Sequence, residues 1–271
     1  MFGNCPRPVW ERWLQPDATN RIGLACRALL VRDGERTVLL ETGVGAFFEP
    51  KLRERYGVTE PEHVLLRSLA ALGTSDVDVD VVVLSHLHFD HAGGLLAPYQ
   101  QGQAAQLLFP RARFVVGRRA WERATHPHAR DRASFIPELH ALLEHSGRLE
   151  LVDEHGCGSS LPSERYGFSF SDGHTPGLTM TRVVTPHGPV TFVGDLMPGA
   201  AWIHLPITMG YDRYSELLID EKRALLDRVM AERGLLFFTH DPHVALCGVS
   251  RSAEGRYGPV DPVAEVHWAD A

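Results

Sequence analysis

The sequence has few cysteines, no excess of basic residues and no long apolar run. Its four cysteines are scattered without a Cys-x-x-Cys pair, so neither a zinc ribbon nor a thioredoxin-type site is indicated. The formal net charge of -7 argues against nucleic acid or an anionic membrane surface as a partner. No apolar stretch approaches the roughly 18 residues of a membrane-spanning helix, and no secretory signal is visible near the N-terminus.

The composition is that of a globular protein. The chain has 271 residues, of which 44% are hydrophobic and 23% are charged, so an adequate core is expected. Strand and helix patterns mix without a linker or a repeat, which predicts one α/β domain over residues 1–271 with an N-terminal arm at about 1–24. The scattered thiols predict reduced cysteines and a cytoplasmic protein.

Hydrophobic periodicity predicts strands and helices along the whole chain. Two pairs of the expected strands form β-hairpins, over residues 28–41 and 179–193. The remaining expected strands are 76–84, 114–116, 149–152, 168–170 and 235–238. The expected helices are 62–72, 95–100 after Gly93-Gly94, 118–124, 138–145 and 215–232, the last with Ser215 as N-cap and Gly234 as its stop.

The most informative stretch is His86-Leu87-His88-Phe89-Asp90-His91, directly after the apolar residues 81–84. A strand that ends in this cluster delivers three imidazoles and one carboxylate to one place. Imidazole and carboxylate suit zinc and its first-row neighbours. A single histidine is more often a surface or core residue, but four ligand-type residues at this spacing are rare by chance.

Further along the chain, short apolar strands again end in ligand-type residues. Three of them lead to His174, Asp195 and His240, and the strand at 37–40 leads to Glu41. Strand ends on one edge of a sheet are where α/β sites assemble. Neighbouring glycines allow the backbone to approach a ligand closely.

In order and local context, seven of these residues resemble the metal ligands of metallo-β-lactamase-fold hydrolases. The string from Ser85 to Gly94 is most similar to the acyl-homoserine-lactone lactonase branch, and the matching motifs run from about Leu39 to Asp241. The resemblance implies a four-layered αβ/βα sandwich, the metallo-β-lactamase fold. It also implies two divalent metal ions, with Zn²⁺ as the first choice and Mn²⁺, Co²⁺ or Fe²⁺ as alternatives. By the same resemblance, one ion is held by His86, His88 and His174 and the other by Asp90, His91 and His240. Asp195 bridges the two ions.

The resemblance further implies a quorum-quenching type of hydrolase that opens a lactone or related carboxylic ester with a metal-bridging hydroxide, Asp90 passing a proton to the leaving group. The expected partner is this small molecule, and a homodimer is allowed. A phosphodiester or phosphotriester hydrolase and a glyoxalase II-like thioesterase stay open on the same fold. An iron oxygenase is a remote alternative, because diiron relatives carry Glu at the position of His88. A non-enzymatic binding protein should have lost ligands, and all seven are present.

Two acidic residues near the ligands have competing interpretations. Asp172 orients a ligand histidine or caps a turn, and the first is favoured. Asp241 orients a ligand or is only a turn residue. Glu41 stands where the family usually has Asp, which lengthens the reach of the carboxylate.

The substrate contacts carry the weakest signals. The lactonase branch often places Tyr where this chain has Pro198, so His204 or Tyr211 could supply the missing donor. Phe47 and Phe48, with Phe2, Trp10 and Trp13, could form an apolar wall for an acyl chain, or pack in the core or a dimer. Cys247 lies too far past His240 to match the cysteine ligand of true β-lactamases.

Overall fold

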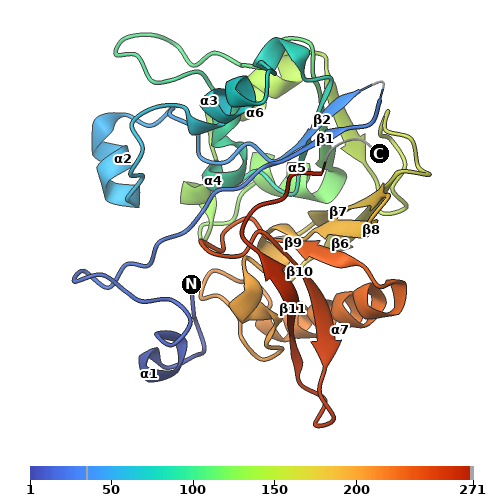
Figure 1. The fold of residues 1–271 in the computed structure, drawn as a ribbon. Coiled ribbons are helices and arrows are strands. Elements are labelled where there is room, and N and C mark those ends of the chain that lie inside the picture. Colours follow the sequence, from blue (N-terminus) through green and yellow to red (C-terminus); the bar gives the residue numbers. More distant parts are fainter. Residues whose placement is uncertain (35, 269–271) are drawn as a thin grey trace. The chain divides into compact units, whose positions relative to one another are not determined.

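The computed structural model describes residues 1–34 and 36–268, and the chain divides into two compact units. The central unit is Cys26–Ser160, and the terminal unit combines Met1–Ala25 with Leu161–Ala271. Each unit has its own sheet (Figure 1). Each also has its own cluster of buried hydrophobic side chains. The expectation of a single domain stays a prediction.

The central unit is built on a five-stranded sheet in chain order. The expected hairpin forms from β1 and β2, which pair antiparallel, and the pairs from β2 to β5 are parallel. All four residues of β3 are buried, as a parallel strand between two neighbours requires. The strands are β1 (Leu29–Arg32), β2 (Thr37–Leu40), β3 (Val81–Leu84), β4 (Arg113–Gly117) and β5 (Leu149–Val152).

Five helices of the central unit connect these strands. Leu69 of α3 and Leu139 and Leu143 of α6 are buried in the cluster that also contains β3 and β4 side chains. The expected helices at 62–72, 118–124 and 138–145 are confirmed within one to two residues. The helices are α2 (Pro50–Tyr56), α3 (Val64–Ala71), α4 (Phe89–Ala92), α5 (Arg118–Thr125) and α6 (Pro137–His145).

Two expectations for the central unit are wrong. Residues 76–84 are not one strand, because Asp76–Asp78 form a 3₁₀ turn capped by Ser75 before β3 begins. The helix expected at 95–100 is absent as well. A 3₁₀ turn, Gly93–Leu95, is followed by an extended bridge between Leu96 and Leu107. The glycines serve close packing there, since a Cβ on Gly94 would lie 2.1 Å from the carbonyl oxygen of Thr42.

The terminal unit contains a six-stranded sheet in the order β11-β10-β9-β8-β7-β6. Its pairs are antiparallel except β8 with β9, which α7 (Ser215–Glu232) separates in the chain. The hairpin expected over 179–193 is confirmed, whereas β10 and β11 were not expected. The strands are β6 (Tyr166–Ser171), β7 (Leu178–Thr185), β8 (Gly188–Phe192), β9 (Leu235–Phe237), β10 (Leu246–Arg251) and β11 (Tyr257–Val263), and α1 (Arg7–Trp10) lies within the expected N-terminal arm.

Helix α7 has the expected bounds, but its capping residues differ from those expected. Tyr214, not Ser215, is the N-cap, and Arg233 takes the left-handed conformation (φ 52°) one residue before the expected glycine stop. The buried face of the helix contains four apolar residues and Lys222. Within residues 1–34 and 36–268, no helix is both long and apolar enough to cross a membrane.

Candidate metal centre

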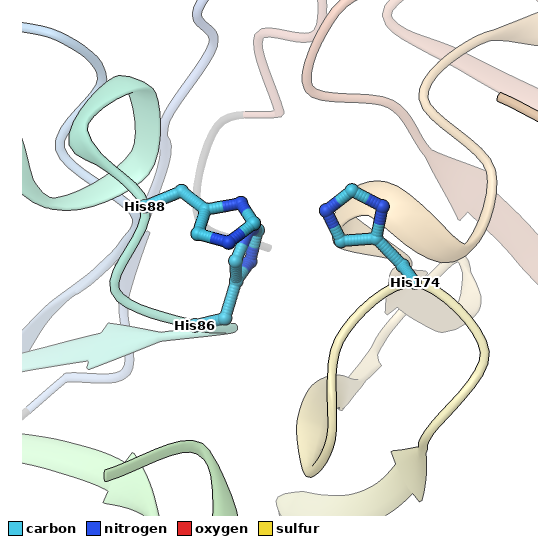
Figure 2. A group of neighbouring side chains, drawn as sticks. All are labelled: His86, His88 and His174. Atoms are coloured by element: carbon cyan, nitrogen blue, oxygen red, sulfur yellow. The ribbon is translucent and has the colours of Figure 1, made fainter. Parts of the chain in front are cut away.

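The histidine cluster of the central unit lies where β3 ends and α4 begins. His86 follows β3, His88 is the N-cap of α4, and Asp90 and His91 are in its four residues (Figure 2 shows His86 and His88). The ring of His86 has its centroid 4.4 Å from that of His88 and 4.1 Å from that of His91. His91 is fully buried, whereas the Asp90 side chain is one-third exposed. The strand-to-helix turn therefore gathers this part of the expected ligand set.

Two neighbours orient the histidines of this unit. Glu41 Oε2 lies 3.0 Å from His91 Nδ1, and its Oε1 accepts a hydrogen bond of 2.7 Å from the Ser85 amide. Ser85 Oγ lies 2.9 Å from His86 Nδ1. An oxygen at Nδ1 fixes the ring and directs Nε2 toward a metal ion. Glu41 thus orients a histidine despite its longer side chain, from a left-handed backbone (φ 68°) at the end of β2.

The terminal unit gathers the other three expected ligands, with two histidines beside Asp195. His174 lies on the loop between β6 and β7 (Figure 2), Asp195 in the turn Gly194–Leu196 after β8, and His240 after β9. The two oxygens of Asp195 face different rings. His174 Nε2 lies 3.3 Å from Oδ2, and His240 Nε2 lies 3.2 Å from Oδ1.

The opposite nitrogens of both rings also meet oxygen. His174 Nδ1 lies 3.0 Å from Asp212 Oδ1, and His240 Nδ1 lies 2.7 Å from the carbonyl oxygen of Ala25. A carbonyl only accepts, so His240 Nδ1 carries the hydrogen. With the hydrogen at Nδ1, the Nε2 of His240 can donate its lone pair to a cation between this nitrogen and the Asp195 carboxylate. This donor set fits divalent metal ions.

All seven expected ligands belong to groupings of His and Asp side chains that could hold a metal ion. Nitrogen and carboxylate oxygen are donors for zinc, manganese, cobalt and iron alike. The donor set therefore favours first-row divalent ions as a class.

The model of the metallo-beta-lactamase superfamily matches residues 21–240, which span parts of both units. The chain belongs to this superfamily. An N-acyl homoserine lactonase from a Bacillus species is 27% identical over 227 residues, with 78% of this chain and 79% of that protein covered. A probable metallo-hydrolase of Mycobacterium tuberculosis is 27% identical over 275 residues, with 91% of this chain and 83% of that protein covered.

Two solved structures support the metallo-β-lactamase fold. A probable metal-dependent hydrolase from Staphylococcus aureus superposes with a TM-score of 0.85 at 24% identity, over 99% of this chain and 92% of its own. A dizinc quorum-quenching lactonase, AidC, superposes with a TM-score of 0.69 at 23% identity, over 91% and 81%. The expected fold class, the four-layered αβ/βα sandwich of metallo-β-lactamases, is confirmed.

Some expected roles in this metallo-β-lactamase-superfamily chain belong to other residues. Asp172 Oδ1 accepts a hydrogen bond from the Gly177 amide, which is the turn-capping alternative. Asp212, which the sequence did not single out, orients His174 instead. Its only sequence signal was an acidic side chain within the mostly apolar residues 202–212. Asp241 accepts from the amides of His243 and Val244, as a turn residue does, and also from the distant Ala200 amide.

The aromatic candidates divide between the two units. Phe47 and Phe48 help to line a cavity of about 540 Å³ in the central unit, with Tyr56, Phe89, Phe135 and Ile136 among its other walls. The cavity adjoins the histidine cluster, because Phe89 directly follows His88 and the Phe135 ring lies 4.9 Å from the His88 ring.

The other aromatic candidates lie in the terminal unit. Phe2 stacks on Trp10 at 5.4 Å and on Trp202 at 4.4 Å, and Trp13 lies near the exposed ring of His204. Tyr211 is 64% exposed. Phe2 packs against the hydrophobic cluster of the terminal unit and Phe47 packs against that of the central unit. The expected wall thus takes its aromatic residues from both units and stays a prediction.

Pro198 and Cys247 have structural environments. The Pro198 carbonyl accepts a 2.9 Å hydrogen bond from the His240 amide, so Pro198 holds the loop that carries this histidine. Burial raises the pKa of the Cys247 thiol to about 12. A thiol of this kind stays protonated at neutral pH, in keeping with the exclusion of a cysteine ligand.

Proposed function

We propose that this chain is a dinuclear metal-dependent hydrolase that opens lactones or related carboxylic esters. One ion would be held by His86, His88 and His174, the other by Asp90, His91 and His240, and Asp195 would bridge them. The observation that carries this proposal is the carboxylate of Asp195, whose two oxygens face two imidazoles that are held by oxygen on their far sides.

When bound, two divalent ions supply a hydroxide at neutral pH and polarise the ester carbonyl. Side-chain oxygens at Nδ1 orient three of the ligand histidines. Glu41 contacts His91, Ser85 contacts His86 and Asp212 contacts His174. Asp90 is exposed enough to meet substrate and lies 3.8 Å from His91 Nε2. Its carboxylate would accept a proton from the attacking water and pass it to the leaving alkoxide.

The aromatic cavity of the central unit supports an ester with an apolar tail. A volume of about 540 Å³ is typical of a small-molecule pocket, and its walls are mostly apolar. Each buried CH₂ contributes up to ~0.8 kcal/mol, so two or three methylenes could raise kcat/KM by tenfold or more. The relative that is an N-acyl homoserine lactonase agrees with this choice of substrate class.

The test begins with metal-stripped protein that is reloaded with zinc, manganese, cobalt or iron(II). Elemental analysis should approach two equivalents per chain, and activity should return with the metal. The reloaded protein is then given lactones of increasing acyl length, an aryl ester, a thioester and a phosphotriester. Lactone turnover that rises with acyl length supports the proposal.

Two results would contradict it. Full activity with one equivalent of metal would overturn the dinuclear centre. A phosphotriester that is turned over far better than every lactone would replace the carboxylic ester by a phosphorus ester. A Phe48→Ala variant serves as the matched control for the cavity, because it should lose the chain-length preference while keeping the metal content.

A further inference from the structure

Two adjacent charged residues of α7 each bind the backbone of a segment that reaches His174. We infer that Glu221 and Lys222 are positioning residues for the His174 imidazole. The inference rests on the proposed function, in which His174 is a metal ligand. It assigns a role to the polar part of a helix whose other buried residues are apolar.

Glu221 binds the three residues that directly precede His174. Its Oε1 accepts from the Asp172 amide at 2.9 Å, and its Oε2 accepts from Ser171 Oγ at 2.6 Å and from the Gly173 amide at 3.1 Å. The turn also lies against the helix, since a Cβ on Gly173 would come within 2.4 Å of Leu218 Cβ. One carboxylate thus fixes the backbone from which the His174 side chain projects.

Lys222 binds the segment that leads to Asp212. It is 0% exposed, and its Nζ donates to the carbonyl oxygens of Trp202 at 2.9 Å and Ile207 at 2.7 Å. Burial lowers the pKa of Lys222 to about 7, and the carboxylate of Asp212 opposes that shift. The lysine is therefore electrostatically coupled to the carboxylate that contacts His174 Nδ1.

The two segments also join each other beside His174. The amides of Arg213 and Tyr214 donate to the carbonyl oxygen of Gly173 at 2.8 and 2.9 Å. Asp212 Oδ2 accepts from the Met209 amide at 2.6 Å, which fixes the carboxylate whose other oxygen faces the imidazole. Glu221 therefore holds the backbone of His174, and Lys222 holds the loop of its partner.

Packing alone does not account for a lysine at this place. An apolar side chain of similar volume usually stabilises a buried helix face as well as or better than a buried charge. Lys222 instead satisfies carbonyl oxygens of residues 202–207 that a methionine would leave without this donor. Lys222 therefore stabilises the conformation of the segment that leads from Trp202 to Asp212.

The experiment compares Lys222→Met and Glu221→Gln with Leu226→Ala, a control on the same helix that removes apolar packing. Leu226 is fully buried in the hydrophobic cluster of the terminal unit. Zinc affinity is measured by chelator competition and thermal stability by Tm. We expect zinc affinity to fall about tenfold in each of the two charged-residue variants, by analogy with loss of a group that orients a ligand. Leu226→Ala should lower Tm and keep the parent's zinc affinity.

A second readout does not depend on metal. In stripped protein with labelled histidine, NMR should report a single His174 tautomer, protonated at Nδ1, in the parent and in Leu226→Ala. Exchange between tautomers or ring orientations should appear in Lys222→Met and Glu221→Gln. If both variants lower Tm but leave the tautomer and the zinc affinity unchanged, their role is structural and the inference is overturned. A parent that takes up no zinc defeats the proposed function instead, and the NMR comparison then decides the inference by itself.

Discussion

The two units reach a similar local arrangement by different routes. In the central unit, four candidate ligands lie within six residues at a single strand-to-helix turn. In the terminal unit, three candidate ligands follow three different strands, and the partner of His174 is 38 residues away in the chain. The first arrangement depends mainly on local backbone conformation, and the second depends on long-range packing. Mutations far from the ligands should therefore disturb the ligand arrangement of the terminal unit more than that of the central unit.

The largest effect should come from the carboxylate that both units need in the proposed centre. Asp195→Ala removes the group that would bridge two ions, so we expect kcat/KM to fall at least ~10²-fold, the scale seen when a key electrostatic group is lost. Metal content should fall with it. Asp172→Ala is the matched control, because Asp172 caps the turn that contains His174, one of the two histidines that face Asp195. Near-normal turnover of Asp195→Ala with metal retained would sink the assignment.

Most of the central unit could be predicted from sequence because its signals are local. The hairpin, β3, the helix at 64–71 and the ligand cluster all show in periodicity or spacing within about a dozen residues. The exceptions were the helix expected at 95–100 and the strand expected to begin at residue 76. Pro98 interrupts the expected helix, and Gly94 before it packs closely against Thr42.

The terminal unit was harder to predict because its signals are distributed. Strand β11 contains Pro259 and Pro262, which argue against a strand, and the sheet accommodates them because β11 is an edge strand. Asp212 gave no usable signal, since its contact with His174 depends on the path of residues 175–211. The sequence analysis did not single out Lys222, which the structure places on the buried face of α7.

The next prediction compares the carboxylates that orient one histidine in each unit. Glu41→Gln and Asp212→Asn keep shape but remove the charge beside Nδ1 of His91 and His174. We expect each to weaken zinc binding by 10- to 100-fold, the range typical of such partners. Chelator competition on both variants gives the comparison directly. An affinity unchanged by Asp212→Asn would mean that the terminal unit holds His174 through its backbone alone.

The smallest expected effect concerns stability in the central unit alone. His140 of α6 is buried beside Trp121 and Phe135, and burial lowers the pKa of its imidazole to about 4, against a weaker opposing effect of Glu138. Because the folded state prefers the neutral ring, unfolding takes up a proton between pH 6.5 and 4. This contribution to stability is complete above pH 6.5 and is lost as the pH falls toward 4.

Between pH 7 and pH 4.5, His140 should therefore remove about 2 kcal/mol from the free energy of unfolding. Urea unfolding of metal-stripped parent and His140→Leu at both pH values isolates the effect, since the other histidines contribute equally to both proteins. The variant should lose less stability on acidification than the parent. Equal losses would mean that His140 becomes protonated without cost in the folded state, so that the packing around α6 admits water and the central unit is less closed than its local contacts indicate.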